Sequence, residues 1–287
     1  YDTINKSIDY NFIVIKNNYT YHNILRSFDN KIASLPIVND QGKLIDLLNY
    51  SEFKNAYITD DQRIIRARCP VRISFAGGGT DFNEFINYNQ SSILTSSINK
   101  YCTASILVRK DNKVNIISKD LNLKYSANNI SEIKMGGKLN LIKATIKLLN
   151  PKFGFDLETY AEFSPGTGLG GSSAIVSAII GGFNYFRNDN LYDLYKIADL
   201  SYQAERLETG ITGGWQDYYA CIFGGFNVIN FKKDDVLVNP IKINRETLLE
   251  LEYNLMFFRF KSTRSSSLIQ QKNIKQIKQS KQKFTNN

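Results

Sequence analysis

Residues 164–174 read Ser-Pro-Gly-Thr-Gly-Leu-Gly-Gly-Ser-Ser-Ala, and the apolar run that follows at residues 175–186 is long enough for a helix. Glycines let backbone amides approach an anion closely and adopt positive φ angles. The start of a helix adds unpaired N–H groups and a partial positive charge, and serine hydroxyls can bind phosphate oxygens or Mg²⁺. The stretch therefore predicts a phosphate-binding loop for a triphosphate. A structural turn that caps the helix is the alternative for a glycine-rich loop on its own.

The spacing within this loop excludes two common nucleotide-binding motifs. No Lys follows the last glycine, so the loop is not a Walker A motif, and its glycines do not follow the GxGxxG spacing of dinucleotide-binding folds. The rest of the chain must therefore decide which kind of site the loop serves.

A strand predicted upstream of the loop carries a second glycine cluster. From Ile65 to Phe75 apolar residues occupy every second position, which is the period of a half-buried strand. Pro70 within this run predicts an edge strand or a bulge. The strand leads into Ala76-Gly-Gly-Gly-Thr-Asp81, where Thr80 is expected to cap a helix that begins there.

A third polar segment follows the loop. Glu205 lies on a helix predicted over residues 191–208, whose apolar residues mark one face, and Gly213-Gly-Trp-Gln-Asp217 comes next. Read alone, Glu205 is a solvated residue paired with Arg206, and Asp217 is a turn former after two glycines. The three segments in this order are a stronger signal of function than any one of them alone.

The loop PGTGLGGSSA resembles the phosphate loop of the GHMP small-molecule kinases, the superfamily of galactokinase, homoserine kinase and mevalonate kinase. Residues 69–81, CPVRISFAGGGTD, resemble the superfamily's N-terminal substrate motif. Ala204-Glu205 with GGWQD at residues 213–217 resembles the segment that holds the metal ligand and the catalytic Asp. Together with Thr263-Arg-Ser-Ser-Ser267, these motifs are most similar to those of the D-glycero-D-manno-heptose 7-phosphate kinases. The resemblance covers residues 64–269.

The resemblance implies an α+β chain with the GHMP kinase fold, whose N-terminal domain is a two-layer α/β domain similar to ribosomal protein S5. The sequence itself also favours α+β, because strands and helices alternate irregularly in the middle of the chain. The superfamily normally has a third Gly-rich motif near its C-terminus, and none follows Ile269. We therefore expect the kinase domain, residues 61–269, to lack its C-terminal subdomain, and residues 270–287 to form a basic polar tail.

The resemblance also implies the chemistry. The expected reaction is ATP-dependent phosphorylation of a sugar hydroxyl, at the anomeric oxygen of D-glycero-D-manno-heptose 7-phosphate, giving the 1,7-bisphosphate for nucleotide-activated heptose. Carried over from the family, Asp217 orients or deprotonates the attacking hydroxyl and Arg72 steadies the phosphoryl charge. Glu205 and Ser173 bind Mg²⁺, an oxygen-only set that suits a hard cation. Glu208 is the rival of Glu205 for this role.

The remaining predicted contacts divide between ATP and the sugar phosphate. ATP is expected to contact the loop at Pro165, Gly166, Gly168, Leu169, Gly170, Gly171, Ser172 and Ser173. The sugar is expected to contact Gly78, Gly79, Thr80, Asp81, Gly214, Trp215 and Arg264. Arg264, after a strand predicted over residues 255–258, can meet the sugar's own phosphate with two hydrogen bonds, or it is a solvated cation at the start of the tail.

Individual residues leave other interpretations or departures open. Arg72 can be an exposed strand cation beside Arg66 and Arg68. Two positions depart from the heptose kinases: Gly171 stands where they commonly have Ser, and Tyr218 stands where most have Gln.

The first sixty residues are predicted to form a separate unit, residues 1–60. Strands at residues 34–38 and 44–48 flank an Asn39-Asp-Gln-Gly42 turn, and helices are predicted at residues 20–28 and after Ser51. The stretch LPIVNDQGKLIDLL resembles a CBS motif, from regulatory modules that bind adenine nucleotides, and one such motif is visible. A small α/β appendage is the alternative. The single histidine, His22, lies in this unit, which excludes histidine catalysis in the kinase region.

Two alternative functions stay open beside the heptose kinase. L-fucokinase-like sugar kinases share related Gly-rich and GGWQD-like segments. The non-enzymatic alternative is a truncated, inactive remnant that binds nucleotide or a partner through its CBS-like segment.

Composition limits the class of protein and its partners. A length of 287 residues suggests about two domains, and no run approaches the roughly 18 apolar residues of a membrane helix. The start lacks the basic and apolar regions of a signal peptide, and the three separated cysteines form no CxxC pair, so we expect a cytoplasmic protein.

Net charge gives little support to a nucleic-acid partner. Eight basic residues and no acidic residue lie from Arg259 onward, so removing them from the net charge of +9 leaves +1 for the rest of the chain. The expected partner is a small sugar phosphate, with neither nucleic acid nor membrane, and a homodimer is left open.

Overall fold

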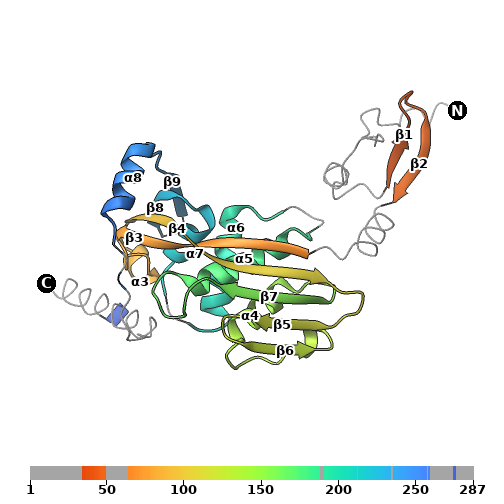
Figure 1. Ribbon diagram of the computed structural model, residues 1–287, viewed down its shortest axis with the longest axis horizontal. Helices are drawn as coiled ribbons and strands as arrows, with labels where there is room; N and C mark the ends of the chain where they lie inside the picture. Colours follow the sequence, from red (N-terminus) through yellow and green to blue (C-terminus); the bar gives the residue numbers. More distant parts are fainter. Residues whose placement is uncertain are drawn as a thin grey trace. The chain divides into compact units, whose positions relative to one another are not determined.

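The computed structural model describes residues 34–49, 64–187, 191–211, 213–233, 235–256, 258 and 274–275. The chain divides into two compact units, one of Tyr1–Arg63 with Arg187–Leu191 and one of Ile64–Phe186 with Tyr192–Asn287. The three motifs singled out in the sequence lie in the second unit (Figure 1).

In the first unit the described residues form an antiparallel hairpin. β1 (Ser34–Val38) pairs with β2 (Leu44–Asn49), which confirms the two predicted strands. The Asn39 side chain closes the turn by accepting hydrogen bonds from two backbone N–H groups. The helices predicted at residues 20–28 and after Ser51 lie outside the described residues, as does the histidine, so the resemblance to a CBS motif stays a prediction.

The second unit is built on a mixed seven-stranded sheet. Its strands are β3 (Ile64–Ala76), β4 (Ser91–Val108), β5 (Val114–Ser118), β6 (Leu123–Ala127), β7 (Phe155–Ala161), β8 (Phe226–Lys232) and β9 (Asp235–Pro240). They follow the order β6-β5-β7-β4-β8-β9, with β3 paired to β4. β5 and β7 are parallel, and the other pairs are antiparallel. This mixture confirms the predicted α+β class.

Four helices complete the core: α5 and α7 pack against the sheet, α4 packs against α5, and α6 packs against α5 and α7 (Figure 1). They are α4 (Asn140–Leu149), α5 (Gly171–Asn184), α6 (Leu194–Tyr202) and α7 (Gln216–Phe223). α5 is buried on most of its surface, as an apolar helix at the centre of a domain should be. Its residue Ile179 lies in one core cluster with Val71 and Ile106 of the sheet, so the sheet and α5 hold both ends of the phosphate loop.

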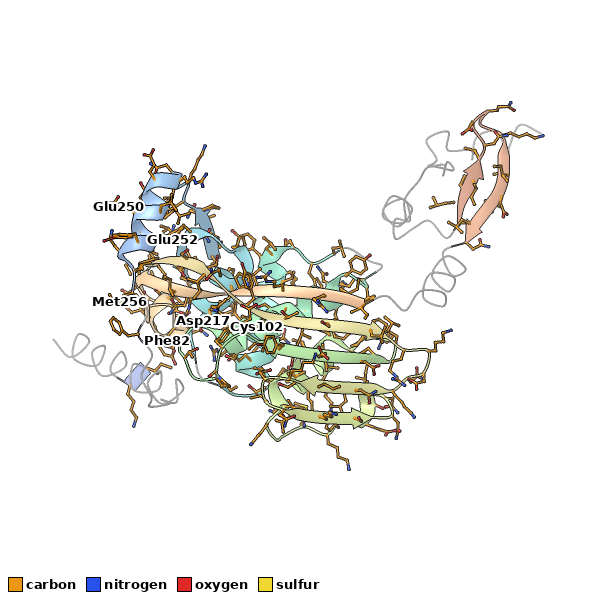
Figure 2. All side chains as sticks on the ribbon, in the orientation of Figure 1. Phe82, Cys102, Asp217, Glu250, Glu252 and Met256 are labelled. Carbon is orange, nitrogen blue, oxygen red and sulfur yellow. The ribbon has the colours of Figure 1, made fainter. Side chains whose placement is uncertain are left out.

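The remaining elements lie at the margins of the unit. α3 (Asn83–Ile86) follows the first glycine cluster, and η1 (Ile130–Glu132) precedes α4. α8 (Arg245–Asn254) contains no buried residue, and Figure 2 shows Glu250 and Glu252 along it and Met256 beyond its end. No helix in the described part of the chain is long and apolar enough to cross a membrane.

The sequence is right about one irregularity and one helical segment, and wrong about one strand. The register of β3 against β4 shifts between Pro70 and Arg72, which confirms the bulge predicted from the proline. The helix predicted over residues 191–208 is confirmed as a helical segment, in which α6 continues into a π-helical turn, η2 (Gln203–Leu207). Such turns recur at functional sites, and this one carries Glu205.

The prediction of a strand over residues 255–258 is wrong. Leu255 ends α8 as its C-cap, and neither Leu255 nor Met256 lies in a strand. Apolar composition alone suggested the strand, and a short apolar run does not distinguish a strand from other structure.

Candidate active site

The predicted phosphate loop joins β7 to α5 in a backbone conformation that requires glycine. Gly166, Gly168 and Gly170 adopt φ angles of 77°, 74° and 77°, which side chains rarely tolerate. Gly170 is the N-cap of α5, and the helix start carries neither a side-chain cap nor an acidic residue in its first turn. No side chain therefore caps the N–H groups at the start of α5, which is the arrangement that binds an anion at a helix N-terminus.

Arg72 and Asp217 form an ion pair beside this loop. Nε and Nη2 of Arg72 donate to Oδ1 of Asp217 at 2.9 and 2.5 Å, and Nη1 donates to the carbonyl oxygen of Gly168 at 2.9 Å. Their side chains are only 12% and 14% exposed, so Arg72 is not an exposed strand cation. Burial alone would lower the pKa of Arg72, but the neighbouring charge of Asp217 raises it above its usual value.

Glu205 receives hydrogen bonds from the start of α5 and from α7. Ser172 Oγ donates to Oε1 at 2.6 Å, Ser173 Oγ donates to Oε2 at 2.9 Å, and the Tyr218 hydroxyl donates to Oε2 at 2.9 Å. Arg206 Nη1 lies 3.5 Å from Oε1. Glu205 is 2% exposed, so it is not a solvated surface residue, whereas its rival Glu208 is exposed.

This carboxylate and its serines fit Mg²⁺. The ion prefers oxygen ligands and is usually held by one or two carboxylates together with substrate phosphates and waters. Glu205 and Ser173 supply a carboxylate and a hydroxyl 2.9 Å apart at the start of the helix that follows the phosphate loop. Across the described ranges, no three side chains of the His, Cys, Asp and Glu types converge to hold a metal.

Asp81 joins the first motif to the third. Its Oδ2 accepts a hydrogen bond from the backbone N–H of Gln216 at 2.9 Å, and the Gln216 side-chain Nε2 lies 3.4 Å from Oδ1. A Cβ on Gly214 would lie 1.9 Å from the Asp81 carboxylate, so this position must be glycine. Burial raises the pKa of Asp81. Asp81, which is predicted to bind the sugar, therefore also anchors the start of α7, the helix that carries Asp217.

Thr80 does not cap the helix that follows it, so that prediction is wrong. Its hydroxyl donates to the carbonyl oxygen of Gly77 at 2.7 Å and pairs with the Ser91 hydroxyl. The N-cap of α3 is Phe82, without a side-chain hydrogen bond. The turn after β3 lies close to β4: a Cβ on Gly77 would be 2.1 Å from the Ser92 carbonyl oxygen. This close approach brings Thr80 to Gly77 and Ser91 instead of to the start of α3.

The other predicted sugar contacts lie around this turn and the start of α7. Gly79 adopts a φ angle of 88°, and a Cβ on Gly78 would lie 3.2 Å from Ser74 Oγ. The Trp215 ring stacks on Tyr202 at 3.5 Å, and its N–H donates to Asn83 at 2.7 Å. One face of the Trp215 ring thus contacts Tyr202, and its N–H is hydrogen-bonded to Asn83, so both interact within the protein.

Arg264 lies outside the described residues, so its predicted contact with the sugar's phosphate stays a prediction.

The structure explains why glycine stands at position 171. A Cβ there would lie 2.6 Å from Cε2 of the Phe163 ring. Because Phe163 also packs against the main core cluster, a serine at position 171 would require that ring to move. The Phe163 ring thus occupies the space that a serine side chain at position 171 would need.

The three cysteines lie buried beneath the loop as free thiols; Figure 2 labels Cys102. Cys102 Sγ donates to the carbonyl oxygen of Gly171 and Cys69 Sγ donates to that of Cys221, each at 3.5 Å. Burial raises the pKa of Cys69 to about 12. These thiols therefore stay protonated and act as packing groups rather than nucleophiles.

A cavity of about 870 Å³ opens along one side of the phosphate loop. The loop contributes Pro165, Thr167 and Leu169 to its wall, and neighbouring strands contribute Ile98 and Tyr160. Its lining is mainly apolar, with the side chains of Lys100, Asp120 and Glu162 at its polar parts. Such a mixture is typical of a pocket for a small-molecule ligand or cofactor.

Sequence reasoning missed several of these residues. It noted Tyr218 only as a departure from relatives, whereas the structure places its hydroxyl on Glu205. It did not single out Gln216, although this residue lies inside the GGWQD motif. Gln216 Oε1 is buried and has no hydrogen-bond partner among the described residues. Phe163 carried no local signal, because its role depends on the glycine it faces.

Part of the chain is similar to a known domain family and to a known protein. Residues 140–225 match the N-terminal domain of the GHMP kinases. A D-glycero-alpha-D-manno-heptose 7-phosphate kinase of Campylobacter jejuni is 34% identical to this chain over 215 residues, which are 73% of this chain and 63% of that protein.

Two solved structures are similar to this one. A D-glycero-D-manno-heptose 1-phosphate kinase from Bacteroides thetaiotaomicron shares 32% identity at a TM-score of 0.62, covering 66% of this chain and 63% of that one. A sugar kinase from Campylobacter jejuni shares 34% identity at a TM-score of 0.58, covering 68% and 63%. This chain thus spans less than two thirds of the length of these relatives. The sequence match, the fold and the order of the motifs agree: residues 140–225 of this chain are similar to the N-terminal domain of the GHMP kinases, and the larger unit has the fold of these relatives.

Proposed function

We propose that this chain acts as, or forms part of, an ATP-dependent sugar kinase that phosphorylates the anomeric hydroxyl of D-glycero-D-manno-heptose 7-phosphate. The product would be the 1,7-bisphosphate. The observation that carries the proposal is the Arg72–Asp217 pair held against Gly168 of the glycine loop. The choice of sugar is supported by the name of the Campylobacter jejuni relative, of which this chain spans 63%.

The chain's own groups can supply what phosphoryl transfer to a hydroxyl requires. Bound ATP supplies the phosphoryl group, and Mg²⁺ neutralises part of its charge. The amides of residues 166–173 cradle the phosphates, while Ser173 and Glu205 hold the cation. Arg72 occupies Oδ1 of Asp217. The second oxygen, Oδ2, is then the one that accepts the proton of the attacking sugar hydroxyl.

The cavity beside the loop and the first glycine cluster supply two further parts of the proposed site. The nucleoside of ATP enters the cavity of about 870 Å³, whose wall is continuous with the loop at Pro165 and Leu169. The sugar lies toward residues 78–81 and the start of α7, with Arg264 proposed for the sugar's own phosphate. This arrangement would place the sugar hydroxyl between Asp217 and the γ-phosphate of ATP, so that its oxygen bonds to the phosphorus while its proton passes to Asp217 and ADP leaves.

A coupled ADP-release assay with a panel of sugars tests the proposal. The panel contains D-glycero-D-manno-heptose 7-phosphate, the heptose 1-phosphate, L-fucose and galactose, with the Asp217→Asn variant as a blank for contaminating kinases. Turnover with heptose 7-phosphate alone supports the proposal, and turnover with L-fucose favours the L-fucokinase-like alternative. ATP binding without ADP release in the presence of any sugar indicates the inactive remnant and contradicts the proposal.

A further inference from the structure

Tyr218 is buried where it can act on one atom of the site. The residue is fully buried, and its hydroxyl donates to Glu205 Oε2 at 2.9 Å. Its ring meets the Tyr202 ring edge-on at 5.7 Å, and the Arg206 guanidinium lies 5.5 Å from its centroid. The ring is thus confined on several sides, and its hydroxyl holds the carboxylate from the side of α7.

The other hydroxyl groups on Glu205 belong to the segment that is proposed to contact the phosphates and the cation. Ser172 and Ser173 donate to Glu205 from the first turn of α5. A serine hydroxyl that coordinates a cation or meets a phosphate turns to suit that ligand, so its hydrogen bond to the carboxylate depends on the ligand as well as on the fold. Tyr218 lies on another helix and has no such competing duty, so its hydrogen bond can persist in both states.

We infer that Tyr218 is a positioning residue that holds the Glu205 carboxylate in the orientation needed to bind the divalent cation of a metal–nucleotide complex. This inference rests on the proposed function, because it assumes that Glu205 is a metal ligand. Partners in the second layer around a metal orient its ligands, and their loss typically lowers metal affinity by about 10–100-fold. Tyr218 acts through Glu205 and contacts neither substrate nor reacting atoms.

The test is calorimetric and needs no turnover. A non-hydrolysable ATP analogue is titrated into the whole chain with and without Mg²⁺, and the ratio of the two affinities is the metal-dependent gain. Tyr218→Phe is expected to leave the metal-free affinity unchanged and to reduce the gain by roughly 10–100-fold. Tyr219→Phe is the matched control, because that neighbouring buried hydroxyl lies on the same helix but donates to Asp199, at 2.9 Å. It should keep the full gain.

Two more variants separate positioning from simple damage to the fold. In a Glu205→Gln background the further change Tyr218→Phe should have no additional effect on the gain. Tyr218→Gln, which keeps an N–H donor at the same position, should retain more of the gain than Tyr218→Phe. Thermal unfolding reports whether each variant is folded. In Tyr218→Phe alone the buried Glu205 carboxylate loses a hydrogen-bond donor, which can destabilise the fold. The double variant has no charge at position 205, so the test stays usable if Tyr218→Phe alone is unstable.

The outcomes distinguish this inference from the proposed function. If the wild-type chain binds the analogue equally well with and without Mg²⁺, the metal site itself is wrong and both proposals fall. If the wild-type chain shows the gain and Tyr218→Phe keeps it, the proposed function stands and the role of Tyr218 is wrong. An equal loss in Tyr218→Phe and Tyr219→Phe also contradicts the role, because it would reflect damage to α7 rather than the hydrogen bond to Glu205.

Discussion

Arg72 and Asp217 lie 145 residues apart in the sequence and form an ion pair through one oxygen of the Asp217 carboxylate. Two donors of Arg72 converge on Oδ1, and a third reaches the Gly168 carbonyl oxygen in the loop. One arginine of β3 therefore aligns the first residues of α7 with the phosphate loop. Because both hydrogen bonds to Asp217 fall on the same oxygen, the guanidinium fixes the orientation of the carboxylate without covering both of its oxygens.

Replacing Asp217 by Asn tests its role as proton acceptor. The amide oxygen can still accept hydrogen bonds from Arg72, but the side chain can no longer take a proton from the sugar. We expect kcat to fall by about 10²–10⁴-fold while calorimetry shows an unchanged affinity for the ATP analogue. Asp111→Asn serves as control, because Asp111 also pairs with an arginine, Arg109, away from the loop. Near wild-type turnover in Asp217→Asn would remove the catalytic assignment.

Adding a side chain at Gly170 tests the loop. The φ angle of 77° makes any side chain strained there by about 1–2 kcal/mol, and the new Cβ would lie 3.6 Å from Arg72 Cγ and Asp217 Cγ. Gly170→Val extends further into this space, so we expect it to weaken binding of the ATP analogue and lower turnover.

A matched variant separates backbone strain from the contact with the ion pair. Gly210 has a φ angle of 70°, and no described atom lies within 4 Å of the position its Cβ would take. Gly210→Val should therefore cost comparable stability in thermal unfolding but leave nucleotide affinity unchanged. If both variants bind the ATP analogue as wild type does, the loop assignment is wrong.

The buried carboxylate of Asp81 should make stability depend on pH. Its pKa in the folded chain is raised above 3.8, chiefly by burial. Its favourable contribution is therefore complete below pH 3.8 and is lost as the pH rises through the folded-state pKa. Relative to Asp81→Asn, the wild-type chain should lose free energy of unfolding over this interval and show no further change above it.

Urea denaturation of both proteins at a series of pH values measures this difference. Asn at position 81 can still accept a hydrogen bond from the Gln216 backbone, and its amide can pair with Gln216 Oε1, which lacks a partner among the described residues. We expect the Asn variant to fold at neutral pH for this reason. A stability difference that stays constant with pH would contradict the raised pKa of Asp81.

Two adjacent glycines in α5 should respond to alanine in opposite directions. At Gly181 no described atom outside the helix backbone lies within 4 Å of the new Cβ, and alanine favours helix over glycine by about 0.5–1 kcal/mol. At Gly182 the Cβ would lie 2.7 Å from Cδ1 of Ile106, a buried core residue. Crowding of this kind costs about 1–3 kcal/mol.

Thermal unfolding of the two variants tests the packing of α5 on the sheet. Gly181→Ala should raise Tm by a few degrees at most, since about 1 kcal/mol corresponds to roughly 2–4 °C in a domain of this size. Gly182→Ala should lower it. The same sign of change in both variants would contradict the close approach of Gly182 to Ile106.

The local parts of the site could be predicted because short-range rules control them. Glycines at every second position of the loop require left-handed backbone, and the apolar run after them requires a buried helix, which the structure has as α5. The alternation from Ile65 to Phe75 likewise predicts β3, and Pro70 predicts its irregularity. Each of these depends on neighbours within one turn or one strand.

Side chains that meet across elements were beyond such rules. Whether Thr80 caps α3 or turns back to Gly77 depends on how closely β3 and β4 approach. The helix predicted through residues 191–208 has no sequence signal for the π turn that carries Glu205. Gly171 looked like the loss of a hydroxyl until Phe163 was found against it.

By itself the sequence determined the class of fold, the phosphate loop and the order of three motifs, because backbone preference and apolar periodicity are written in consecutive residues. The tertiary structure alone decided which side chains meet. Packing of α5 and α7 on β3 and β4 brings Arg72 to Asp217, and the π turn brings Glu205 to Tyr218. These pairs depend on burial, since charged and hydroxyl groups removed from water must find partners wherever the fold places them.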